Sequence, residues 1–173
     1  MTRLQEQNLD VLHQLVHLLD QLSVEAYTQP LLILHEHTVG QHVRHIAEFY
    51  QCLLGRPADA TALSDVVNYD ARQRDRVLET NPVAARRVLL DATIALNLPQ
   101  TDAQLILEDK EGQRLITSLS RELSYLIEHT VHHMAVLRIV LDSAFPTIQV
   151  PDHFGVARST LRHREQVAEG TER

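Results

Sequence analysis

The stretch from Ser120 to Leu141 reads SRELSYLIEHTVHHMAVLRIVL and decides the fold. It contains neither glycine nor proline, and its apolar residues recur three or four positions apart, which predicts a long amphipathic helix. Together with the preceding position, one stripe on this helix consists of Leu119, Leu123, Leu126, Ile127, Thr130, Met134, Leu137 and Leu141.

Three further long helices are expected upstream of this one. The first covers about residues 4–27, where Leu and Val recur at helical spacing. The second begins at Thr38, which forms a capping box with Gln41, and ends before Gly55. The third covers about residues 81–96, because Asn-Pro at its start supplies an N-cap and a proline at the first helical position.

A short strand pair is expected between the third and the last helix. Residues 105–107 and 115–117 are apolar and flank a polar turn at 109–112, which is typical of a β-hairpin. The prediction is an all-α fold, a four-helix bundle with a minor β-hairpin before the last long helix. We expect a single domain over residues 1–173, with the bundle over about 3–142 and an irregular C-terminal tail over 143–173.

Composition narrows the classes of function. The 173 residues carry a net charge of -7, which argues against nucleic acid as a partner, because phosphate binding needs a clustered positive surface. No apolar run approaches the roughly 18 residues that span a bilayer, so no membrane partner is expected. Cys52 is the single cysteine, which excludes an internal disulfide and suits the cytoplasm.

Histidine is unusually frequent, with 11 residues, and two of them form a spaced pair on the last helix. His129 and His133 are one turn apart on one row, at the edge of the apolar stripe. Side chains at i and i+4 are about 5–6 Å apart at Cβ, so two imidazoles can reach one ion. The alternative is that both rings form ordinary hydrogen bonds or face solvent.

A third histidine must come from the second helix, which carries His42 and His45. Its periodicity places His42 nearer the apolar stripe, and either ring could reach across to the last helix. Three histidine ligands leave coordination positions open, as catalytic zinc sites do.

Two segments carry a family resemblance. His45-Ile46-Ala47-Glu48 and His129-Thr130-Val131-His132-His133 resemble the metal-ligand motifs of the DinB-like superfamily, the DinB/YfiT-like metalloenzymes. The resemblance spans roughly residues 3–142 and implies that His45, His129 and His133 hold a divalent metal. It therefore selects His45, whereas periodicity favours His42.

The resemblance also implies candidate functions. The superfamily is similar to transferases that use low-molecular-weight thiols such as bacillithiol and mycothiol, so we expect a metal-dependent thiol S-transferase or hydrolase acting on a small-molecule substrate. Zn²⁺ or Ni²⁺ would suit imidazole ligands and would activate a water or thiol. The alternative is a non-catalytic module that binds or senses a ligand. Similar bundles pair through helices, so a homodimer is expected.

Four more residues are assigned supporting roles. Glu48 is expected to orient His45, and Glu122, on the row of His129, is a second partner outside the ligand set. Arg72 and Arg74 could hold a substrate carboxylate or phosphate, because guanidinium pairs with both. The alternative for the two arginines is a solvated ion-pair network.

Overall fold

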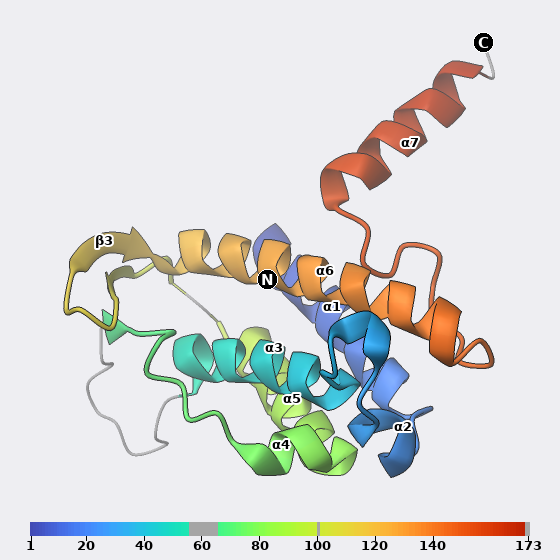
Figure 1. The fold of residues 1–173 in the computed structure, drawn as a ribbon. Coiled ribbons are helices and arrows are strands. Elements are labelled where there is room, and N and C mark those ends of the chain that lie inside the picture. Colours follow the sequence, from blue (N-terminus) through green and yellow to red (C-terminus); the bar gives the residue numbers. More distant parts are fainter. Residues whose placement is uncertain (56–65, 100, 172–173) are drawn as a thin grey trace.

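The structure is a computed structural model and describes residues 1–55, 66–99 and 101–171. The described part is mostly helical and includes a small three-stranded sheet. Its four longest helices are α1 (Arg3–Leu19), α3 (Val39–Leu54), α5 (Pro82–Asn97) and α6 (Leu119–Ala144). Helices α1 and α3 each pack against both α5 and α6, and the core lies between them (Figure 1).

The helix starts follow the local capping signals. Thr38 and Gln41 form the expected capping box at the start of α3, and Gly55 ends that helix. Asn81 accepts hydrogen bonds from the first backbone N–H groups of α5, and Pro82 is its first residue. These groups have no partner within a helix, so the side-chain caps fix where each helix begins.

The prediction of one helix over residues 4–27 is wrong. Helix α1 ends at Leu19, and a separate short helix, α2 (Val24–Thr28), follows. Ser23 caps α2 by accepting a hydrogen bond from the Ala26 backbone N–H. Serine competes for backbone N–H groups in this way, so a local cap interrupts an apolar pattern that could otherwise continue as a helix.

The expected hairpin is present and belongs to a larger sheet. Strands β2 (Gln104–Glu108) and β3 (Arg114–Ser118) pair antiparallel, and β1 (Val66–Val67) adds to β2 in parallel. A strand of two residues leaves too little alternation to be predicted. The sheet leads directly into α6, because Ser118 at the end of β3 is the N-cap of that helix.

The segments on either side of the long helices also contain helices. A short helix, α4 (Arg76–Thr80), precedes α5. The tail, predicted to be irregular with a short helix near Thr160, contains α7 (Arg158–Thr171), which extends away from the other helices in Figure 1. Before α7, the buried ring of Phe154 anchors the chain against the core. Among the described residues, no helix is both long enough and apolar enough to cross a membrane.

A series of buried hydrogen bonds sets the register of α3 against α1 and α6. Tyr50 Oη donates to Asn8 Oδ1 at 2.7 Å, and Asn8 Nδ2 donates to the Leu123 carbonyl oxygen at 3.1 Å. Thr130 Oγ1 lies 3.5 Å from Tyr50 Oη and can donate to it. Thr130 is next to His129, so these contacts help to fix which part of α3 faces the histidines of α6.

Candidate metal centre

Three histidines from two helices meet in the structure. His45 projects from α3, and His129 and His133 project from α6. One ring nitrogen from each residue can be chosen so that all three lie within 4.8 Å of one another. The rings are packed closely, with centroids 4.7 to 4.9 Å apart. The fold therefore brings together the three residues selected by the family resemblance.

The nitrogens of this cluster face one another. His45 Nε2 and His129 Nε2 are 3.1 Å apart, and His129 Nδ1 is buried with no hydrogen-bond partner in the described part of the chain. Two nitrogens bound to one tetrahedral ion at about 2.0 Å would be roughly 3.3 Å apart, close to the observed separation. The donor chemistry and this spacing fit a divalent metal. A histidine that only stabilised the core would normally satisfy both ring nitrogens.

The surroundings keep the three imidazoles neutral. Burial is the main cause that lowers the pKa of His45 and of His129 to about 4 each, and the pKa of His133 to about 3. The neighbouring histidines and, for His45 and His129, the positive charge of Arg72 act in the same direction. At neutral pH the rings therefore have lone pairs available for a metal.

His42 is also in contact with the cluster, although it stands outside the group of three. Its Nδ1 lies 3.0 Å from Nδ1 of His133, and burial lowers its pKa as well. Periodicity correctly indicated that His42 faces inward. In the structure both histidines of α3 face α6: His45 meets His129, and His42 meets His133.

An aromatic wall, made of Phe49, Tyr69 and Tyr125, borders the histidines. The Phe49 ring stacks on His129 with centroids 4.0 Å apart, and Tyr69 stacks on Phe49 at 4.8 Å. Tyr125 lies 5.8 Å from His129 and is partly exposed. The sequence reasoning missed these residues, although Phe49 is at i+4 from His45 and Tyr125 at i-4 from His129. The same i, i+4 rule that selected the histidine pair could have found Phe49 and Tyr125, whereas Tyr69 lies outside both helices.

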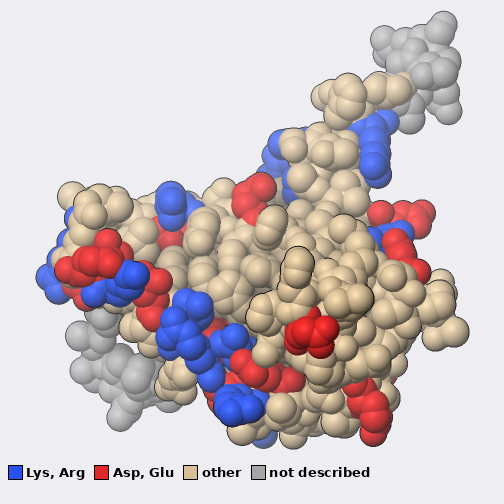
Figure 2. Space-filling model, in the orientation of Figure 1, with Lys and Arg blue, Asp and Glu red and all other residues tan. Residues whose placement is uncertain are grey.

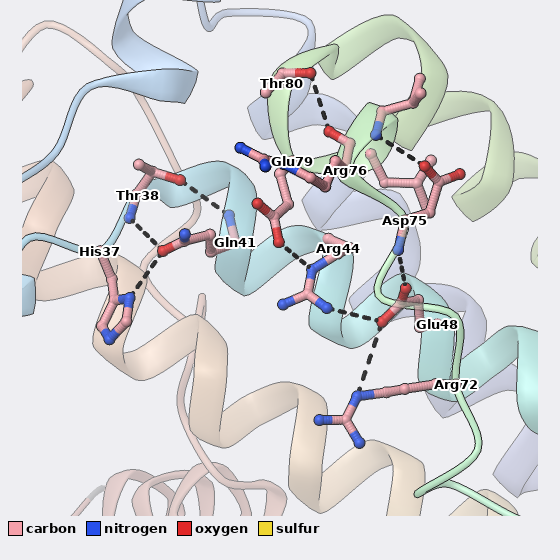
Figure 3. Close-up of polar contacts among 12 residues, drawn as sticks. His37, Thr38, Gln41, Arg44, Glu48, Arg72, Asp75, Arg76, Glu79 and Thr80 are labelled. Carbon is pink, nitrogen blue, oxygen red and sulfur yellow. Dashed lines mark hydrogen bonds and ion pairs between the residues drawn. The ribbon is translucent and has the colours of Figure 1, made fainter.

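Glu48 does not contact His45 as expected, because its carboxylate is held by other groups. Oε1 accepts from the Asp75 backbone N–H at 2.6 Å, while Oε2 lies 3.1 Å from Arg44 Nη1 and 3.8 Å from Arg72 Nε. Figure 3 shows Arg44 between Glu48 and Glu79, with its Nε 2.9 Å from Glu79. This buried ion-pair network ties α3 to the segment before α4.

Glu122 has a similar structural role on α6. Its fully buried carboxylate accepts hydrogen bonds from Tyr69 Oη at 2.8 Å and Thr117 Oγ1 at 2.6 Å, and it pairs with Arg121. Burial and the Glu122 charge raise the pKa of Tyr69, so its hydroxyl remains a donor. Glu122 therefore supports the aromatic wall through Tyr69, and its partners are groups other than the histidines.

The two predicted substrate-binding arginines are placed differently. The Arg72 guanidinium lies 5.6 Å from the centre of the Phe49 ring and donates to the Tyr69 carbonyl oxygen, at the edge of the aromatic wall. Arg74 is exposed, and no contact found within the described residues joins it to the histidines. Figure 2 shows Lys and Arg side chains next to Asp and Glu side chains in the region of the loop before α4.

Arg72 also lines a cleft of about 300 Å³. Glu48, Cys52 and Arg72 are among its lining residues. Burial raises the pKa of the Cys52 thiol, so this residue favours the protonated, weakly nucleophilic form. Arg72 thus borders both this cleft and the Phe49 ring, which stacks on His129.

Comparisons with known proteins leave the family open. No family model matches the chain, and no solved structure matches it. A curated relative is the FK506-binding protein 5 of Rhizopus delemar, which is 29% identical over 113 residues. The match covers 60% of this chain but only 29% of that protein, so this chain is similar to a minor part of it.

Proposed function

We propose that this chain binds one divalent metal ion, Zn²⁺ or Ni²⁺, through His45, His129 and His133, and that it is a metal-dependent enzyme of the thiol S-transferase or hydrolase type. The observation that carries the proposal is the cluster of three neutral imidazoles whose nitrogens face one another. A divalent ion held by neutral ligands keeps its full charge and lowers the pKa of a water or thiol in its open positions.

We also propose that the chain is a DinB-like protein and that α1, α3, α5 and α6 form its four-helix bundle. The pairwise packing of these helices supports this arrangement, since each contacts two of the others. The ligand positions support it too, because one histidine on α3 and a spaced pair on α6 is the pattern that the resemblance implies. Cytoplasmic location and pairing of two copies remain parts of the same proposal.

The substrate side of the proposal depends on the residues around the histidines. The aromatic wall offers apolar surface, and Arg72 offers a positive charge close enough to affect the pKa of both His45 and His129. An anionic small molecule, such as a low-molecular-weight thiol with a carboxylate, could place its charge at Arg72. Cys52 favours its protonated form, so a reacting thiol would have to come from the small molecule.

Metal content of protein purified without a histidine tag tests the ligand set. We expect about one ion per chain in the unaltered protein and strong loss in His45→Ala, His129→Ala and His133→Ala. The matched control is His132→Ala, which removes an exposed histidine next to His133 and should leave the content unchanged. Full occupancy in both His129→Ala and His133→Ala would refute the site.

A second measurement separates the enzyme from the non-catalytic binding module. Calorimetry with several cellular thiols should show binding to the metal-loaded protein and none to the metal-free protein. Arg72→Ala should weaken that binding more than Arg74→Ala, because Arg72 is the one of these two that lies beside the aromatic wall. Binding without consumption of thiol across a panel of acceptor substrates would favour the binding module. Absence of binding by every thiol would remove the transferase.

A further inference from the structure

His42 contacts one of the proposed ligands without belonging to the ligand group. It lies on α3, three residues before His45, and its Nδ1 is 3.0 Å from Nδ1 of His133. The two ring centroids are 5.3 Å apart and the ring planes are inclined by 59°. The group whose nitrogens converge consists of His45, His129 and His133. His42 therefore touches this group from outside, through a single nitrogen.

The contact has two proton arrangements with different consequences. A hydrogen bond between neutral imidazoles needs an N–H on one nitrogen and a lone pair on the other. If His133 Nδ1 carries the hydrogen, Nε2 of the same ring has a free lone pair. If His42 is the donor instead, the hydrogen of neutral His133 is on Nε2, which then cannot bind an ion. The direction of this hydrogen bond thus decides whether Nε2 of His133 can coordinate an ion.

We propose that His42 is a positioning residue for the metal centre. Its Nδ1 accepts a hydrogen bond from Nδ1–H of His133 and holds that ring in the tautomer and orientation that present Nε2 to the ion. This inference rests on the proposed metal site. Ligand histidines commonly donate their second N–H to a carboxylate or carbonyl, and here an imidazole fills that place. The proposal gives both inward-facing histidines of α3 distinct roles, one as a ligand and one as the partner of a ligand.

Metal affinity of His42 variants is the first test. In competition with a chelator, His42→Ala should bind Zn²⁺ about 10- to 100-fold more weakly while still reaching one ion per chain. His42→Asn should recover most of the affinity, because its amide oxygen can accept from His133 at nearly the place of Nδ1. His132→Ala is the matched control, since its ring is exposed and contacts His133 only from the side, with centroids 5.5 Å apart.

Cobalt-loaded protein provides a readout that a general loss of packing would not reproduce. Proton NMR resolves the ring N–H signals of histidines that hold a paramagnetic ion. We expect the His133 Nδ1–H signal to exchange slowly with water in the unaltered protein and rapidly in His42→Ala, with the His45 and His129 signals unchanged. Visible absorption should show the same number of ligands in both proteins.

The outcomes separate this inference from the proposal beneath it. Equal Zn²⁺ affinity in His42→Ala and the unaltered protein, with metal bound in both, would overturn the positioning role alone. Loss of one ligand in the cobalt spectrum of His42→Ala would make His42 a ligand and also overturn it. An unaltered protein that binds no metal would overturn the metal site itself. If His42→Ala fails to fold, as judged by circular dichroism, failure of His42→Asn to restore affinity overturns the proposal.

Discussion

Replacement of Glu48 by glutamine should destabilise the protein far more than an ordinary loss of an ion pair. The Glu48 side chain is 2% exposed, and its Oε2 lies 3.1 Å from Arg44, whose side chain is 13% exposed. Removal of one partner from a buried ion pair costs about 3–5 kcal/mol, because the other charge is left without compensation. Arg44 keeps Glu79 as a second acceptor. We therefore expect a loss near the lower end, about 3 kcal/mol in the free energy of unfolding.

Glu108→Gln is the matched control for this change. Glu108 pairs with Arg114 at 2.6 Å, a shorter distance than in the Glu48 pair, but the Arg114 side chain is 61% exposed. Exposed pairs contribute about 0–1 kcal/mol, so the shorter ion pair should matter less. For a chain of this size, each kcal/mol shifts the melting temperature by about 2–4 °C. The expected decrease is thus about 6–12 °C for Glu48→Gln and below about 4 °C for Glu108→Gln.

Thermal and urea unfolding of both variants and the unaltered protein provide the assay. Amide hydrogen exchange adds a local readout at Asp75, whose backbone N–H donates to Glu48 at 2.6 Å. This amide should keep its acceptor in Glu48→Gln but lose some protection as the segment before α4 loosens. If Glu48→Gln were no less stable than Glu108→Gln, the argument that burial outweighs distance would be wrong for this network.

Three further changes have defined outcomes. Removal of metal by a chelator should preserve the helical circular dichroism and lower the melting temperature by about 5–10 °C. The reason is that an ion at 100 times its Kd contributes about 2.7 kcal/mol to the free energy of unfolding. Collapse to a random coil would contradict this expectation. The metal-free protein should lose stability as the pH falls from about 6.5 towards 4. In this range the three proposed ligand histidines are protonated in the unfolded chain but stay neutral in the folded one, where their pKa values are lower. Urea midpoints should show a smaller loss in His133→Gln. Gly155→Ala should lower the free energy of unfolding, measured in urea, more than Gly112→Ala. Both glycines have positive φ, but a Cβ at Gly155 would lie 2.5 Å from the Ala135 backbone nitrogen, whereas a Cβ at Gly112 would meet open space. Equal losses of stability would show that α6 adjusts freely.

The parts of the fold that could be predicted are those encoded by neighbouring residues. The cap at Thr38, the Asn-Pro start of α5 and the strand pair before α6 each depend on groups within a few residues. The break after α1 was missed although its signal, Ser23, is also local, because the apolar spacing there permits a longer helix. Strand β1 was missed because two residues carry no periodicity.

For the candidate metal centre, too, the sequence predicts what one helix encodes and leaves open what depends on how two helices pack. His129 and His133 could be paired from spacing alone, since one helix carries both. The choice between His42 and His45 could not be made from α3 itself, because the rotation of α3 against α6 depends on contacts such as Tyr50 with Asn8. The role expected for Glu48 failed for a similar reason. Two of its partners, Arg72 and Asp75, lie in a separate segment that only the folded chain brings near.

The division of the histidines between α3 and α6 has a topological consequence. His45 and His129 are 84 residues apart in sequence. An ion held by both would crosslink the chain and close a loop that contains β1, α4, α5, β2 and β3. For a crosslink across a loop of this length, the lost entropy of the unfolded chain corresponds to about 4–5 kcal/mol at room temperature. An ion that stayed bound to both histidines in the denatured chain would thus make that chain more compact, and the urea dependence of unfolding should be weaker with metal than without it.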